Sequence, residues 1–159
     1  MKGIKDWLSA NSIPCNTEEL FLQAITHTSA CAVSSFSYER AEFLGDGVLK
    51  FLASVHVYNL QLKKGSNLPE SADFNLSEER MPLINNENLA VICREIKLSE
   101  HLVCSESIHD KMYSDIVEAM IGAIFVDSGL HKVNMKCGCK WDIAGNFLHT
   151  IVFNNVNKS

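Results

Sequence analysis

Residues 38–49 read YERAEFLGDGVL, and the rest of the chain is best understood outward from this stretch. Its apolar residues recur at spacings of three and four, a pattern that continues to about residue 62 and predicts one long α-helix. Glu42 and Asp46 stand four residues apart, so such a helix places both carboxylates on one face. Acids within an apolar helix are costly unless a cation lies among them.

A second acidic stretch lies about seventy residues later, where residues 115–129 read DIVEAMIGAIFVDSG. Asp115 and Glu118 are three residues apart and therefore also share a helix face. Small residues in both stretches would let the two helices approach closely, namely Gly45, Ala119, Gly122 and Ala123. Four carboxylates placed side by side repel one another without a cation. We therefore expect one or two divalent ions, most simply Mg²⁺, and phosphodiester chemistry.

The residues alone leave two other interpretations of these acids open. Acids one turn apart are common as solvated carboxylates on helix surfaces, although both pairs here lie in otherwise apolar helices. A di-iron carboxylate bundle is the second alternative. It normally uses Glu-x-x-His on its helices, and neither acidic stretch contains a histidine, which disfavours iron.

The remaining pattern predicts an all-α chain without internal repeats. The expected helices cover residues 4–10, a segment opened by Thr17 as N-cap, a segment from Ser77, residues 88–96, a short piece near residue 100, and the tail 133–153. Loops are expected at 29–37 and 63–74, which are rich in small and polar residues. Pro82 is compatible only with the start of its helix or with a kink.

Length and composition predict a single domain of residues 1–159 in an intracellular compartment, nuclear or cytoplasmic. No apolar run reaches the length of a membrane span, and no secretory signal is visible, so the six cysteines are expected to be free thiols. The Cys137-Gly138-Cys139 spacing is poor for a structural zinc site. The net charge of −5 argues against a broadly basic nucleic-acid-binding surface.

Four segments together resemble the ribonuclease III family. Residues 39–49 resemble its signature E-R-L-E-F-L-G-D-[SA]-V-L, with Gly47 where Ser or Ala is usual, and residues 115–129 resemble its second acidic motif. Residues 26–29, THTS, resemble the early L-T-H-x-S element, and residues 84–90, INNENLA, resemble V-N-N-E-x-L-A. The resemblance covers about residues 18–132.

The resemblance implies an all-α ribonuclease III endonuclease domain that acts as a homodimer on double-stranded RNA. It assigns the catalytic, metal-binding roles to four acids, which are Glu42, Asp46, Asp115 and Glu118. The implied cofactor is Mg²⁺, with Mn²⁺ as a substitute. The implied products carry 5′-phosphate and 3′-hydroxyl ends with 3′ overhangs. The cellular role that the resemblance implies is RNA processing or RNA silencing.

Other positions in the resembling motifs carry weaker implications. Glu39 matches a signature acid with a structural or dimer-supporting role. Phe43 matches an aromatic residue that packs into a socket on the partner subunit, with an ordinary core phenylalanine as the alternative. Lys111 matches a lysine of Dicer-like members and would contact RNA or the active site, with a solvated lysine as the alternative. His27 is expected to pack or to cap a helix.

The chain also departs from typical members of that family. About 30 residues follow Gly129, too few for the usual double-stranded-RNA-binding domain, so a separate RNA-binding partner protein is expected. An alternative function is a non-catalytic RNA-binding or ribosome-associated structural module of the same fold. The unsubstituted quartet of acids favours the nuclease.

Overall fold

The computed structural model describes residues 3–64 and 75–129. Within these residues the secondary structure is helical apart from one parallel β-bridge between Thr26 and Val103, which confirms the predicted all-α class. None of the helices in this part of the chain is both long and apolar enough to cross a bilayer. The predicted tail helix 133–153, Cys137, Cys139 and most of the predicted loop 63–74 lie outside the described residues.

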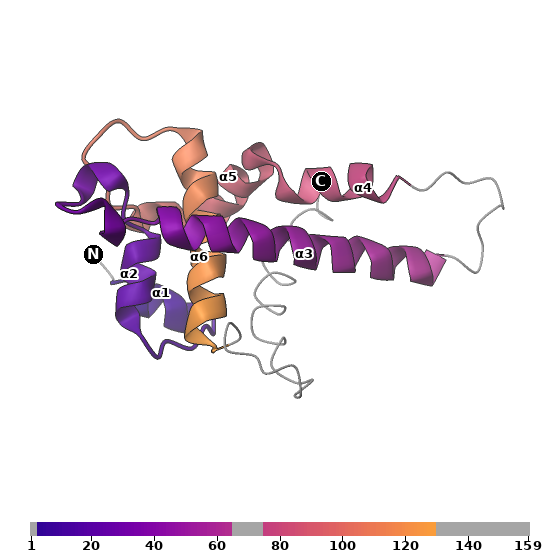
Figure 1. Ribbon diagram of the computed structural model, residues 1–159, viewed down its shortest axis with the longest axis horizontal. Helices are drawn as coiled ribbons and strands as arrows, with labels where there is room; N and C mark the ends of the chain where they lie inside the picture. Colours follow the sequence, from indigo (N-terminus) through magenta and orange to yellow (C-terminus); the bar gives the residue numbers. More distant parts are fainter. Residues whose placement is uncertain (1–2, 65–74, 130–159) are drawn as a thin grey trace.

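Two crossing helices form the frame of the molecule. α3 spans Glu39–Lys64 and α6 spans Asp110–Asp127, so both predicted acidic helices are confirmed. In Figure 1, α6 crosses α3 steeply near the N-terminal part of α3. α6 is buried along most of its length, from Met112 to Ile124, and forms the centre of the hydrophobic core.

Two glycines allow the backbones of α3 and α6 to touch. A Cβ atom built on Gly45 would lie only 1.8 Å from the carbonyl oxygen of Glu118, and one on Gly122 would lie 2.1 Å from that of Ala41. No side chain fits at either position without moving a helix. The crossing therefore places the acids of α3 directly against those of α6, as the small residues in the sequence predicted.

α1, Ile4–Ala10, and α2, Glu18–Ala24, lie beside the lower half of α6 in the view of Figure 1. Thr17 is the N-cap residue of α2, as predicted, but its side chain makes no capping hydrogen bond. The carboxylate of Asp127 instead accepts from the backbone N–H groups of Asn16, at 2.9 Å, and Thr17, at 2.7 Å. A full negative charge at a helix N-terminus also interacts favourably with the helix dipole, which explains why the Thr17 hydroxyl is not needed.

α4, Leu76–Ile84, and α5, Asn86–Glu95, follow one another, and α5 packs on α6. Pro82 lies in the last turn of α4 and not near its start, which was one of the two positions that we expected, the other being a kink. The helix ends two residues later, so the missing N–H group removes only one bond from a turn that is already terminating. Three short 3₁₀ turns complete the described residues: η1, Thr28–Ala30; η2, Ser34–Phe36; and η4, Leu98–His101.

Asn85 joins α4 to α5 by capping the second helix. Its side-chain oxygen accepts from the backbone N–H of Asn88 at 2.7 Å. Replacing Asn85 with Ala should destabilise the fold by about 1 kcal/mol and lower Tm by roughly 2–4 °C in thermal unfolding. The neighbouring exposed Asn86, whose side chain is no cap, provides the control, and Asn86→Ala should leave Tm nearly unchanged. Equal losses in both variants would contradict the capping role.

Candidate active site

The crossing of α3 and α6 forms a cleft of about 580 Å³. Every residue that the sequence singled out for the site lines this cleft: Glu39, Glu42, Phe43, Asp46, Lys111, Asp115 and Glu118. Three residues without a predicted role in catalysis also line it, namely His27, Tyr38 and His109. The cleft thus brings together two stretches that are far apart in the sequence.

Three of the four acids converge on one point. Glu42, Asp115 and Glu118 each offer a carboxylate oxygen within 4.8 Å of the others. Asp46 lies on the wall of the same cleft, and its carboxylate pairs with the Lys50 ammonium at 2.7 Å. The expectation of four converging oxygen ligands is therefore met by three, with the fourth held by a lysine one helical turn away.

Burial and mutual repulsion disfavour the charged form of these acids. Glu118 is only 9% exposed, and its burial, together with the nearby charges of Asp46, Glu42 and Asp115, raises its pKa to about 7. The pKa of Glu42 is also raised, mainly by burial and then by the charge of Asp115. Carboxylates with these environments gain the most from a cation placed among them.

Two neighbours hold the carboxylate of Asp115. The Lys111 ammonium donates to both of its oxygens, at 2.9 and 2.8 Å, and the buried Tyr38 hydroxyl donates to Oδ2 at 3.3 Å. Lys111 is therefore part of the cleft and not a plain solvated lysine. Burial, and then the adjacent charge of Asp115, raise the pKa of Tyr38, so its hydroxyl stays protonated as a donor. Sequence reasoning missed Tyr38, since nothing in its local pattern indicates a partner on a distant helix.

Phe43 lies at the rim of the cleft and is 85% exposed, so the alternative of an ordinary core phenylalanine is wrong for the single chain. It borders a second, mainly apolar groove whose other lining residues are Leu44, Asp46, Gly47, Val48, Phe51 and Phe125. Glu39, which lines the cleft together with Phe43, is exposed, and its carboxylate accepts a hydrogen bond from the Ser37 hydroxyl at 3.5 Å.

His27 behaves as the predicted capping and packing residue. Its Nδ1 atom lies 3.1 Å from the backbone nitrogen of Ser29, which caps η1, and its ring lies 5.5 Å from that of Tyr38 between centroids. The imidazole thus supports the tyrosine that in turn holds Asp115.

The donor set of the cleft fits Mg²⁺. All the converging ligand atoms are carboxylate oxygens, which hard divalent cations prefer, and the cleft leaves room for the water ligands that Mg²⁺ retains. Neither histidine nor cysteine belongs to this cluster of three acids, which separates it from the usual sites of softer metals.

Comparison with known proteins agrees with this geometry. A family model described as ribonuclease-III-like matches residues 17–140. Ribonuclease 3 of Chlorobium chlorochromatii is 35% identical over 123 residues, which cover 70% of this chain and 47% of that protein. Ribonuclease 3 of Ureaplasma parvum is 27% identical over 143 residues, with 84% of this chain and 61% of that protein covered. The chain spans about half the length of the curated relatives that it matches.

Two solved structures share the fold. The nuclease domain of ribonuclease III from Campylobacter jejuni superposes with a TM-score of 0.74 at 24% identity, covering 98% of this chain and 97% of that one. A second structure of the same nuclease domain, described as flexible in a region involved in dimer formation, gives a TM-score of 0.68 at 24% identity. It covers 94% of this chain and 98% of that one.

Proposed function

The chain belongs to the ribonuclease-III-like family, and from this membership we propose that it is a Mg²⁺-dependent endoribonuclease that hydrolyses both strands of double-stranded RNA. The observation that carries the proposal is the convergence of Glu42, Asp115 and Glu118, with Asp46 beside them, in one open cleft. Placing two buried and two half-buried acids where they repel one another costs stability, and a binding module without catalysis would not require that arrangement.

The residues of the cleft have two proposed roles, which are to bind the metal ion and to orient one of its ligands. Glu42, Asp46, Asp115 and Glu118 would hold Mg²⁺, while Lys111 and Tyr38 orient the Asp115 carboxylate by donating to its oxygens. When bound, Mg²⁺ would supply activation of water and stabilisation of the leaving 3′ oxygen. Hydrolysis with the 3′ oxygen as the leaving group would produce 5′-phosphate and 3′-hydroxyl ends. We propose that Lys111, which is mostly exposed, also approaches an RNA phosphate.

We further propose that the chain acts as a homodimer. The exposed Phe43 ring and the apolar groove beside it provide a self-complementary pair of features, a knob and a socket, that a two-fold axis could match. The flexible region reported for the Campylobacter nuclease domain is a dimer-forming one in that protein. Two cleavage sites acting on opposite strands would leave the staggered 3′ overhangs.

Replacing Phe43 with Ala should weaken the dimer by about 2 kcal/mol or more, because a buried aromatic anchor is lost from the interface. Sedimentation velocity across a range of protein concentrations would show the monomer appearing at a concentration roughly thirtyfold higher than in the unchanged chain. Tyr58→Ala, which removes another exposed aromatic ring of α3 outside the groove, should leave the dimer intact. A dimer unaffected by the Phe43 change would contradict the knob-and-socket arrangement.

RNA affinity is expected to be modest. With a net charge of −5, the chain has few cations to neutralise phosphates, so binding by the chain alone should be weak at physiological salt. We propose that a separate double-stranded-RNA-binding protein supplies affinity. Tight binding to duplex RNA by the chain alone at physiological salt would remove the need for that partner.

The test of the proposed function is cleavage of a long labelled RNA duplex by the purified chain, with single-stranded RNA and duplex DNA as controls. We expect cutting of the RNA duplex alone, in Mg²⁺ or Mn²⁺, with discrete products that carry 3′ overhangs, and none in EDTA. A folded, dimeric chain that binds the duplex without cutting it in either metal, with or without a double-stranded-RNA-binding protein, would instead indicate a structural or RNA-holding module.

A further inference from the structure

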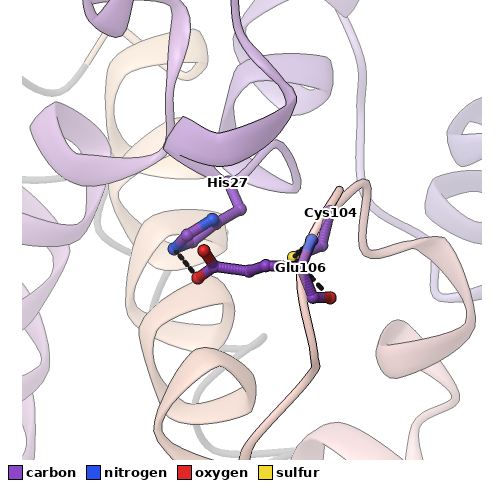
Figure 2. Close-up of side chains that lie close together, drawn as sticks. All are labelled: His27, Cys104 and Glu106. Carbon is purple, nitrogen blue, oxygen red and sulfur yellow. Dashed lines mark hydrogen bonds and ion pairs between the residues drawn. The ribbon is translucent and has the colours of Figure 1, made fainter.

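A second cluster of metal-ligating side chains lies at the edge of the cleft, apart from the acids of α3 and α6. His27, Cys104 and Glu106 each offer one ligand atom, a nitrogen, a sulfur and an oxygen, within 4.8 Å of the others. Figure 2 shows the three side chains pointing toward one another, His27 from the segment before η1 and the other two from the segment that leads into α6.

The backbone holds these two segments together. At the β-bridge, the N–H of His27 donates to the carbonyl of Val103 at 2.9 Å, and the N–H of Val103 donates to the carbonyl of Ile25 at 2.9 Å. The hydroxyl of Ser29 accepts from the N–H of Ser105 at 3.1 Å. His27 and Cys104 therefore lie side by side without help from a ligand, and such preorganisation lowers the cost of binding one.

The ligand side chains are also oriented. Two atoms lie near the imidazole nitrogens of His27: Ser29 Oγ is 2.9 Å from Nδ1, and Glu106 Oε1 is 3.5 Å from Nε2. Nε2 faces Glu106 and is the nitrogen placed to bind a metal. Nδ1 then carries the proton and donates it to the Ser29 hydroxyl, as metal-binding histidines usually do, and the bond that Nδ1 accepts from the Ser29 N–H is given up. The sulfur of Cys104 lies 3.4 Å from the backbone nitrogen of Glu106 and 3.4 Å from its carbonyl oxygen, and these two contacts fix the position of the sulfur.

The chemistry of this donor set selects a borderline-soft cation. A thiolate, an imidazole and a carboxylate together suit Zn²⁺, whereas Mg²⁺ prefers oxygen ligands and would favour the acids of the cleft. The cluster is accessible, since the Glu106 side chain is 49% exposed and that of His27 is 15% exposed. An ion can enter from solvent, and a water molecule can complete a tetrahedral shell.

We propose that His27, Cys104 and Glu106 form a zinc site with one solvent-occupied position, which ties the segment before α6 to the segment before η1. Binding of an ion there would also affect the cleft, because the tied segment leads directly into α6. The tied segment ends at His109, and both His109 and Lys111 line the cleft, so the bound ion fixes the wall from which Lys111 reaches Asp115. The site is distinct from the Mg²⁺ cluster in its residues and in its metal preference.

The test is titration of the full chain with Co²⁺ and then Zn²⁺, in excess Mg²⁺ so that the acids of the cleft are occupied. We expect a thiolate-to-Co²⁺ charge-transfer absorption that saturates at one ion per chain and disappears when Zn²⁺ displaces Co²⁺. A hundredfold excess of Zn²⁺ over its Kd should also raise Tm by roughly 5–10 °C.

Matched variants locate the ion. Cys104→Ser should remove the absorption and weaken Zn²⁺ binding at least about 100-fold, and Glu106→Gln should weaken it about tenfold or more. Cys15→Ser, which changes a half-buried cysteine outside the cluster, should do neither. Since Glu106 is exposed, its variant should fold even if the Cys104 variant does not.

The double variant Cys137→Ser and Cys139→Ser addresses the other cysteines that could bind the metal. We expect it to retain the absorption and the rise in Tm. Three results would overturn the proposal: no absorption in the unchanged chain, absorption that survives in Cys104→Ser, or absorption that is lost in the double variant. Unchanged Zn²⁺ affinity in Glu106→Gln would overturn it as well.

Discussion

Replacing Glu118 with Gln should abolish cleavage of an RNA duplex and, in EDTA at neutral pH, make the protein more stable. Both effects have the same origin. The carboxylate is buried among Asp46, Glu42 and Asp115, where its charge is unfavourable until a cation is bound. Removing that charge relieves the repulsion in the metal-free protein and also removes a ligand of the proposed Mg²⁺. Loss of several kcal/mol of transition-state stabilisation corresponds to a rate at least about 1000-fold lower.

The direction of the pH dependence follows from the raised pKa. Below pH 4.5, Glu118 is protonated in the folded and the unfolded chain and contributes nothing. Between pH 4.5 and about 7 the unfolded chain ionises while the folded chain holds its proton, so the metal-free protein loses stability as the pH rises. Above pH 7 the loss is complete, at roughly 3 kcal/mol. Glu118→Gln should abolish this loss.

Thermal unfolding in EDTA from pH 4 to 8, beside the cleavage assay in Mg²⁺, measures both effects. At pH 8 we expect the Tm of Glu118→Gln to exceed that of the unchanged chain by roughly 5–10 °C, and the two values to approach one another at pH 4. Glu100→Gln, at an exposed acid of η4, is the control and should alter neither Tm nor cleavage appreciably. Retained cleavage by Glu118→Gln would exclude a metal-binding role, and a Tm unchanged at pH 8 would exclude the raised pKa.

Replacing Gly45 with Ala should destabilise the fold and slow cleavage together. The new methyl group would lie 1.8 Å from the carbonyl oxygen of Glu118 and would also approach the backbone nitrogen of Gly122. Because both obstacles are backbone atoms, α3 and α6 must move apart. Overpacking of this kind costs about 3 kcal/mol or more and should lower Tm by at least roughly 6 °C. A displacement near 1 Å between the two pairs of acids should reduce the rate of cleavage about 100-fold.

Gly47 provides a matched control two residues away on the same helix. A Cβ atom on Gly47 meets nothing within 4 Å. Gly47→Ala should therefore stabilise the chain by about 0.5–1 kcal/mol, since alanine is the better helix former. Because Gly47 lines the apolar groove, a change there could also affect the proposed dimer. The thermal unfolding of both variants should therefore be measured at protein concentrations where the chain is monomeric. Equal behaviour of the two alanine variants would contradict the close crossing of α3 and α6.

Some features of the site could be predicted from the sequence because they depend on spacing within one helix. The i, i+4 separation of Glu42 and Asp46 and the i, i+3 separation of Asp115 and Glu118 fix which acids share a face, whatever the rest of the chain does. Gly45 and Gly122 indicated a close crossing, since residues without side chains inside apolar helices usually mark where backbones meet. The long helices followed from the same periodicity.

Other features required the tertiary structure because their partners are distant in sequence. No local pattern shows that Asp127 would cap α2 in place of the Thr17 hydroxyl, or that Tyr38 would donate to Asp115. The family resemblance left Phe43 either facing a partner or in the core, and the periodicity did not show that it would be exposed beside an apolar groove. A hydrophobic residue in an amphipathic helix is expected inside, and only the packing of α3 against α6 reveals which faces stay uncovered.

By itself, then, the sequence determined the two acidic helices, the acids that share a helix face, and the family, because each depends on short-range order along the chain. The tertiary structure alone decided that Glu42, Asp115 and Glu118 converge, that the pKa of Glu118 rises to about 7, and that His27 meets Cys104 and Glu106. Burial and the distances between charges arise only when segments far apart in the chain are packed together. Ionisation and metal preference depend on those two quantities and are therefore properties of the fold.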